Sequence, residues 1–300
     1  DHRILGAALQ YQHWSEDTRQ NWNLYTSMQS VDRDSYYGAG GRPLGPGQPL
    51  TASDRQALNA YGASVDMSWV SGGRYRWLFA PDWEATLGAE WQYNGVEDAM
   101  PGYGRLIDQQ VHTVGGFGQL QYQPHAAWTV LAGARLDHID IRGRYVLDNE
   151  PQTQAKQLQP VAPRLSVQYQ VDPTLQFRAG YAQGYRAPQA FDEDLHIETV
   201  GGAAVFTRLA PGLVPERSHS LNASVDMTFR KTNVESNIIV DVFFTQLDNP
   251  FITANQEQLP SGVAVITKRN GDGAQVAGAN VEANLAISSK WMLQMGGTLQ

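Results

Sequence analysis

Alternation of apolar and polar residues over long segments is the feature that most limits what this chain can fold into. Between residues 83 and 94 one face would carry Trp83, Ala85, Leu87, Ala89, Trp91 and Tyr93. The other face would carry Glu84, Thr86, Gly88, Glu90, Gln92 and Asn94. The same separation recurs over 220–229 and 280–287. A period of two residues indicates β-strands with one apolar and one polar face.

The length of these segments favours a membrane barrel over a soluble sheet. They run for about ten residues, against the five or six that are usual in globular sheets. At roughly 3.3 Å per residue and a tilt of about 45°, such a strand crosses the ~25 Å apolar band of an outer-membrane barrel. Aromatic residues lie near expected strand ends, where such barrels have interfacial girdles: Trp83, Trp91, Tyr93, Trp128, Phe229 and Trp291. The alternative, a soluble β-sandwich, predicts shorter strands and a charged outer face.

The sequence therefore predicts an all-β fold, a transmembrane antiparallel β-barrel. We expect strands near 3–13, 22–32, 60–70, 83–93, 112–122, 127–139, 160–171, 174–185, 217–229, 234–247, 276–287 and 291–300. Tight turns are expected at 123–126, 172–173, 230–233 and 288–290, and long extracellular loops at 33–59, 94–111, 140–159, 186–216 and 248–275. Segment 238–244 is apolar on both faces apart from Asp241, so its outward side stays open.

Composition excludes several classes of protein. Hydrophobic residues make up 42% of the 300 residues and charged residues only 17%, against about 25% in soluble domains. The net charge of −8 argues against a nucleic-acid partner, and the absence of cysteine excludes disulfides and thiol metal sites. The sequence has no run of 18 apolar residues, so no transmembrane helix is predicted. Because no signal peptide opens the sequence, we expect a mature chain or a part of a larger one.

Several motifs resemble the barrel of TonB-dependent receptors. They are PRLSV at 163–167, FRAGY at 177–181, GYRAP at 184–188 and LVPERS at 213–218, with GARLD at 133–137 and GANVE at 278–282. Three further stretches are most similar to receptors of the Bacteroidetes type: SYYGAG at 35–40, MPGY at 100–103 and QAFDEDLH at 189–196. The resemblance covers nearly the whole chain.

The resemblance implies a barrel of 22 strands in the outer membrane of a Gram-negative bacterium, closed by an N-terminal plug. It implies a receptor and active transporter that imports haem, cobalamin or a ferric siderophore, without a required cofactor and with energy from the TonB complex. A surface lipoprotein would be an accessory partner. The sequence predicts about twelve strands, and we find neither a plug nor the final aromatic residue of such barrels. Residues 1–300 are therefore expected to be an internal part of the barrel, in contact with lipid.

His196 is the sharpest candidate for a ligand-binding residue. Haem receptors of the family resemble this chain in placing a loop histidine between a Tyr-Arg-Ala-Pro box, here 185–188, and a second box, here 209–213. Histidine is an axial ligand of haem iron. The alternative is a solvated loop histidine, because a lone histidine makes no metal site.

Other candidates have weaker signals. Asp192, Glu193 and Asp194 offer oxygen ligands for calcium, or form a solvated acidic turn. Arg186 contacts ligand at the barrel mouth or pairs with a carboxylate of the plug or wall. A flat ligand would stack on exposed loop aromatics. The aromatic candidates are Tyr36, Tyr37, Tyr103 and Phe206.

No catalytic constellation is present, so we expect no enzyme. Segment 186–216 holds more acidic than basic residues, which favours haem or cobalamin over a highly anionic ferric catecholate. Two other functions stay open: a passive porin-like channel, and a secreted β-sheet adhesin or hydrolase.

Overall fold

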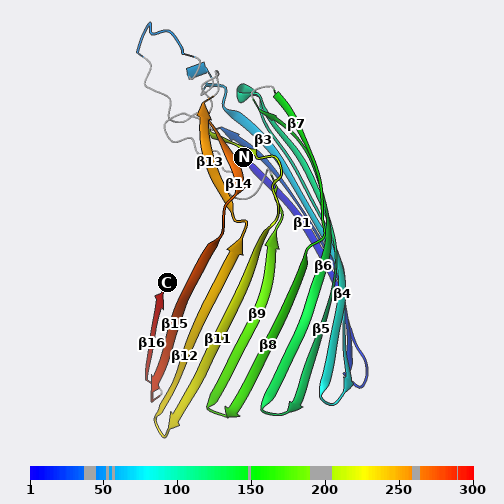
Figure 1. Ribbon diagram of the computed structural model, residues 1–300, viewed down its shortest axis with the longest axis vertical. Coiled ribbons are helices and arrows are strands. Elements are labelled where there is room, and N and C mark those ends of the chain that lie inside the picture. Colours follow the sequence, from blue (N-terminus) through cyan, green and yellow to red (C-terminus); the bar gives the residue numbers. More distant parts are fainter. Residues whose placement is uncertain are drawn as a thin grey trace.

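A single curved antiparallel sheet dominates the computed structural model (Figure 1). The structure describes residues 1–36, 45–51, 54–55, 58–147, 150–189, 205–258, 264–288 and 290–300. The main sheet has thirteen strands, of which β7 (Glu150–Leu158) pairs only with β6. The others follow one another in chain order: β1 (His2–Trp14), β2 (Gln20–Tyr36), β3 (Tyr61–Ala80), β4 (Trp83–Met100), β5 (Arg105–His125), β6 (Trp128–Leu147), β8 (Val161–Asp172), β9 (Leu175–Arg186), β11 (Glu216–Lys231), β12 (Val234–Asp248), β15 (Ala274–Ile287) and β16 (Trp291–Leu299). Each predicted strand is present, and the all-β fold is confirmed.

Strands β3 to β6 are longer than predicted. They contain 20, 18, 21 and 20 residues, so they extend well beyond the length that crosses a membrane. The prediction of a loop at 94–111 is wrong, because β4 and β5 stay paired up to Met100 and Arg105. Only the short 3-10 helix η1 (Pro101–Tyr103) and Gly104 separate them. Continued pairing satisfies backbone groups that a loop would have to leave to water.

The long connections also contain strands where loops alone were predicted. Segments 186–216 and 248–275 contribute β10 (Val205–Leu209), β13 (Phe251–Gln258) and β14 (Ala264–Asn270), which form a separate three-stranded sheet. In it β10 lies parallel to β14, and β13 pairs antiparallel with β14. Segment 140–159 contains the end of β6 and all of β7. The pairing joins segments far apart in sequence, which no local pattern reveals.

Register gives the main sheet one apolar and one polar face. Residues directly opposite each other in a ladder point to the same side. Leu221 pairs with Tyr181 and Phe244 on the apolar face. The outward side of β12 is thereby settled, since Phe244 is apolar-facing and Phe243, opposite Gly278, lies on the polar face. Among the described residues, no helix is long and apolar enough to cross a membrane.

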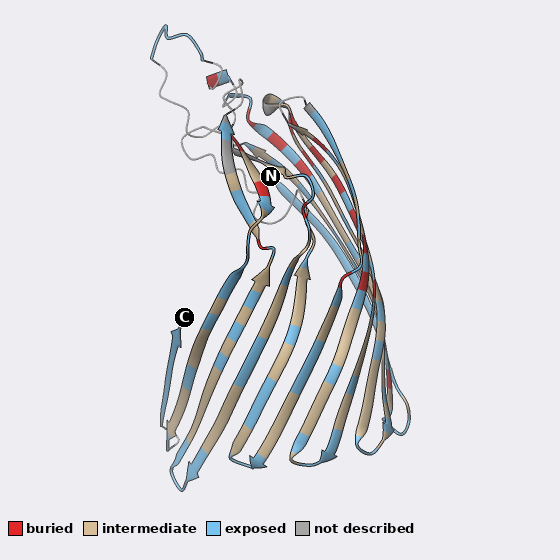
Figure 2. Cartoon of the chain, in the orientation of Figure 1, coloured by how far each residue is buried: buried red, intermediate tan, exposed pale blue. Residues whose placement is uncertain are grey.

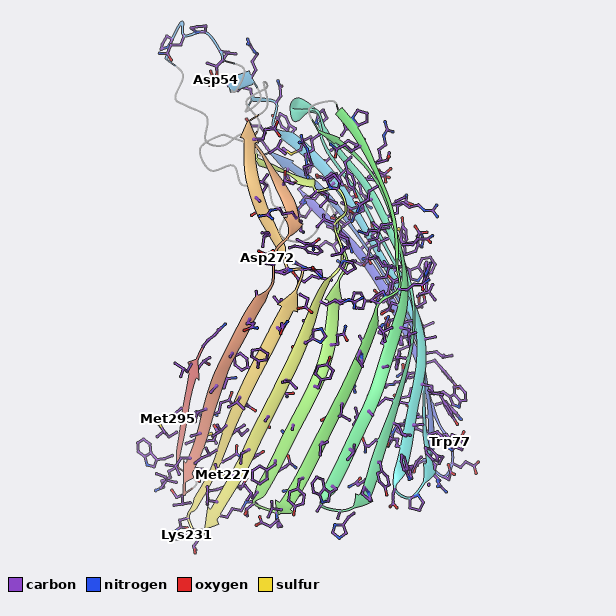
Figure 3. The ribbon with its side chains drawn as sticks, viewed as in Figure 1. Asp54, Trp77, Met227, Lys231, Asp272 and Met295 are labelled. Atoms are coloured by element: carbon purple, nitrogen blue, oxygen red, sulfur yellow. The ribbon has the colours of Figure 1, made fainter. Side chains whose placement is uncertain are left out.

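Two rows of aromatic rings border the apolar face. Rings stack near the short turns, with centroids 4.1 Å apart for Trp22 and Tyr75, 4.1 Å for Trp83 and Tyr122, and 4.3 Å for Trp128 and Tyr169. The short-turn end is also where Figure 3 shows Trp77 and Lys231. A second row contains Trp69, Trp91, Tyr93 and His112. The ten residue-to-residue steps from Trp83 to Tyr93 span roughly 24 Å across a membrane at a tilt of about 45°, which matches the apolar band.

The two faces predict opposite responses to a charged substitution in the complete protein. Val225→Arg places a charge on the apolar face of β11 near its middle, and we expect it to lower the free energy of unfolding by about 2–4 kcal/mol in lipid bilayers. The matched variant Ser224→Arg faces the polar side and should be tolerated better. Denaturant titration in vesicles measures both. Equal losses at the two positions would contradict a lipid-facing apolar side.

Candidate ligand-binding surface

A chain of polar contacts crosses the middle of the polar face. One row of paired residues runs from Tyr25 on β2 through Gly72, Glu90 and Gly115 to Asp137 on β6. Tyr25 Oη donates a hydrogen bond to Glu90, two strands away. This contact bridges the strand that lies between the two partners, β3.

Arg135 and Tyr185 complete this polar network. Arg135 Nη2 donates to Glu90 at 3.2 Å, and its Nε donates to Asp137 Oδ1 at 2.9 Å. Tyr185 Oη, from β9, donates to Asp137 Oδ2 at 2.6 Å. The Asp137 carboxylate is fully buried, which is tolerable because it is both ion-paired and hydrogen-bonded. The network therefore holds β2, β4, β6 and β9 in fixed relation.

Glycine leaves the space that these long side chains occupy. A Cβ at Gly72 would lie 2.6 Å from Tyr25 Oη. A Cβ at Gly115 would lie 2.0 Å from Asp137 Oδ1 and 2.5 Å from Arg135 Nη2. At both positions the neighbouring side chain lies where an alanine methyl would be, so the bridge to Glu90 requires glycine.

Apolar side chains cover the polar face at the end with long connections. Val111, Ile139 and Ile141 are buried there, with Tyr185 and Ala187 packed against them. A second cluster joins Ile107 and Tyr145 to Leu209. Ala187, just after β9, and Leu209, at the end of β10, therefore lie against the polar face of β5 and β6. Figure 2 shows most buried residues in this upper part of the sheet, away from the short turns.

A cavity of about 610 Å³ opens between this wall and the segment that follows β10. Tyr145 Oη lies 3.0 Å from Gln109 Oε1 and 3.1 Å from Gln154 Oε1. Burial, and then the charge of Asp108, raise the pKa of Tyr145, so its hydroxyl stays protonated at neutral pH. The lining residues are Ile107, Tyr145, Gln152, Thr153, Gln154, Ala155, Lys156, Arg208, Leu209, Ala210, Pro211, Gly212 and Leu213. The second sequence box, 209–213, is thus part of a cavity wall.

Arg186 lies where β9 ends and the small sheet begins. Its Nη2 pairs with Glu216 Oε2 at 3.2 Å, and Phe251 N donates to the same oxygen at 2.9 Å. The guanidinium lies 4.9 Å from the centroid of the Phe251 ring, and Lys268 Nζ lies 5.2 Å from it. A wall carboxylate therefore pairs with Arg186, as one of the two sequence interpretations expected.

Arg186 also lines a second cavity, of about 560 Å³, on the polar face. Residues 186–189 form one side of it, and strands β2 to β5 form the other. Gln109 lines this second cavity and connects it to the first, because its Nε2 donates to Gln189 Oε1 at 3.3 Å and its Oε1 accepts from Tyr145 Oη at 3.0 Å. The role of Arg186 in binding ligand stays a prediction.

The other predicted site residues are only partly placed. Tyr36 ends β2, with its ring centroid 4.7 Å from that of Tyr61. Tyr103 belongs to η1 and Phe206 to β10. The remaining candidates lie outside the described residues: Tyr37, Asp192, Glu193, Asp194 and His196. Within the described ranges, no group of three or more His, Asp or Glu side chains could hold a metal ion.

Sequence reasoning missed Tyr145, Gln154 and Lys156 because 140–159 was interpreted as a loop. The signal was present as a short period of two, since Gln152, Gln154, Lys156 and Leu158 share one face of β7. Arg208 was counted only among the charges of segment 186–216, and no position in the fold was predicted for it.

Comparison with known families decides what kind of barrel this is. A family model described as TonB dependent receptor-like, beta-barrel, matches residues 1–300. The chain belongs to this family.

Solved structures of TonB-dependent receptors have the same fold. The hemophore receptor HasR of Serratia marcescens, in complex with its hemophore HasA and heme, has a TM-score of 0.69 at 16% identity over 100% of this chain and 49% of that one. The ferric enterobactin receptor PfeA of Pseudomonas aeruginosa has a TM-score of 0.70 at 13% identity, over 100% and 43%. The siderophore receptor PirA of Acinetobacter baumannii has a TM-score of 0.67 at 11% identity, over 100% of this chain and 44% of that one.

The chain spans about half the length of these solved relatives or less. At such identities the likeness shows the fold alone. No curated protein sequence matches the chain.

The glycine spaces in the polar network give a prediction for adjacent residues of β5. In the complete receptor, Gly115→Ala should displace Arg135 and Asp137 and lower the free energy of unfolding by about 1–3 kcal/mol. Gly116→Ala is the matched control, because its Cβ would meet nothing nearer than Gly88 O at 4.0 Å. Denaturant titration in detergent micelles measures both variants. A Gly115→Ala receptor as stable as the Gly116→Ala receptor would show that the network does not depend on this space.

Proposed function

We propose that the complete protein is an energy-coupled importer of a metal chelate, belonging to the TonB-dependent receptors of the outer membrane. The observation that carries the proposal is a family-matched sheet with a membrane-wide apolar face and ligand-sized cavities on its polar face. Members of this family are receptors and transporters in the outer membrane of Gram-negative bacteria. We therefore propose that the cargo is transported without chemical conversion and that the protein has no enzymatic activity.

The proposal includes strands and a plug beyond those of this chain. β1 and β16 are the edge strands of the main sheet, and each has one neighbour. Unpaired backbone groups are costly in lipid, so a spanning sheet has to close. We infer that residues 1–300 are part of a 22-stranded barrel and that further strands complete it. The TonB complex would act on this barrel through a plug.

The proposed cargo is haem, cobalamin or a ferric siderophore. Two cavities of about 610 and 560 Å³ fall within the range of ~300–1,000 Å³ that is usual for small-molecule sites. The predicted roles of His196 as haem ligand and of Asp192, Glu193 and Asp194 as calcium ligands belong to this proposal. So do ring stacking by Tyr36, Tyr37, Tyr103 and Phe206, and help from a surface lipoprotein.

The test of cargo uses the full-length receptor in detergent, titrated with hemin, cobalamin and a ferric siderophore. If haem is the cargo, hemin should bind saturably, and His196→Ala should abolish the absorption spectrum of axial histidine ligation. His125→Ala, at a short turn on the opposite end of the sheet, is the control. Saturable binding of hemin with an unchanged spectrum in His196→Ala would remove His196 as a ligand.

The test of energy coupling measures growth on the bound chelate as sole source of its metal. Growth should stop in cells that lack TonB, because the proposed plug blocks passive entry. Growth that is independent of TonB would contradict active import and favour a porin-like channel.

A further inference from the structure

The cavity of about 610 Å³ is lined by two cationic side chains, Lys156 and Arg208, from distant parts of the sequence. Among the described residues that line it there is no carboxylate. Its charge therefore differs in sign from that of the whole chain, which is −8.

Lys156 faces this cavity from β7. Lys156 lies two residues before Leu158 and pairs with Ile141 of β6. Both Ile141 and Leu158 belong to the buried cluster on the polar face. Partial burial lowers the pKa of Lys156, because it removes part of the water around the ammonium group. Within the described part of the chain, no carboxylate forms an ion pair with Lys156.

Arg208 enters from the other side, on β10. Its Nη1 reaches Glu257 Oε2 at 3.4 Å, but that side chain is 62% exposed, so the pair is weak. Its Nε is buried and has no hydrogen-bond partner among the described residues. A buried donor without an acceptor is unfavourable, so this atom is suited to an acceptor that the protein itself does not supply.

Neutral donors and apolar walls complete the surroundings. The amides of Gln152 and Gln154 lie on the same wall as Lys156, and the Tyr145 hydroxyl beside them is hydrogen-bonded within that wall. Ile107, Leu209 and Leu213 form apolar surface beside them. An apolar body with negative oxygens at one edge matches this arrangement, because charged hydrogen bonds to Lys and Arg are strong where water is displaced.

We propose that this cavity is a subsite for an anionic oxygen group, a carboxylate or a catecholate, at the edge of the transported chelate. Lys156 and Arg208 bind that group from opposite sides and make the receptor select anionic chelates over neutral ones. This inference rests on the proposed function, because it assigns the cavity to the imported cargo.

The experiment compares matched anionic and neutral probes on the full-length receptor in detergent. Hemin and its neutral dimethyl ester test a carboxylate, while a ferric tris-catecholate and a neutral ferric trihydroxamate test a catecholate. The variants are Lys156→Gln, Arg208→Gln and the double variant. Arg142→Gln is the control, because Arg142 lies on the same wall but is 73% exposed and ion-paired with Asp140 on the opposite face.

Each cavity variant should lower the affinity for whichever anionic probe binds by about ten-fold or more. The double variant should weaken it further. The neutral partner should bind the wild type more weakly and change less than about two-fold, and the control should leave both unchanged. Loss with hemin but not its ester identifies a carboxylate, and loss with the tris-catecholate identifies a catecholate.

Saturable binding of an anionic probe that neither variant weakens overturns the subsite and leaves the proposed import function standing. Equal wild-type affinity for both members of a pair also overturns the subsite. No saturable binding of any metal chelate contradicts the proposed function, and the subsite with it. Heat-modifiable migration in gels confirms that each variant barrel is folded before it is titrated.

Discussion

The backbone hydrogen-bond ladder is the constraint on which the rest of this structure depends. In hydrocarbon every N–H and C=O group needs a partner within the protein. Along the order from β1 to β16, each intervening strand is paired on both sides. Once the ladder is formed, its register decides which residues face lipid, since a slip of one residue would reverse every side chain. Such a slip in β4 would bring Glu90 to the lipid side and put Ala89 or Trp91 in its place in the polar network.

Outside the membrane the same ladder has a different consequence. β5 and β6 continue well past the aromatic rows, and their extensions form a wall on which later segments pack. Because this wall is continuous with the membrane strands, Tyr185 can contact both the apolar cluster and Asp137 of the polar network. The cavities, the small sheet and the polar network therefore lie against one continuous set of paired strands.

Local pattern predicted the strands of the main sheet because each carries its own period of two. It did not predict β10, which is five residues long and pairs with β14 some 60 positions later in the sequence. Nor could it orient β12, where Phe243 is apolar and yet lies on the polar face. The structure explains this exception, because Gly278 opposite Phe243 leaves room for the ring. Space of this kind belongs to a pair of strands and not to one segment.

The candidate site shows the same limit more sharply. The position of Arg186 at the end of a strand followed from a motif, but its contacts with Glu216 and Phe251 depend on where the small sheet packs. Charge counted along 186–216 is acidic and favoured cargo with little negative charge. The cavity is lined instead by one cation from that segment and one from β7.

Two cations at contact distance can outweigh the net charge of the chain. Charges farther than about 8 Å from a site are largely screened at physiological salt, whereas groups that touch the ligand in a partly dry cavity are screened much less. The chain's net charge of −8 would slow the approach of an anion, but Lys156 and Arg208 act after water has been displaced. The proposed selectivity for anionic chelates therefore depends on which segments the fold brings together, and the total charge of any one loop is a poor guide to it.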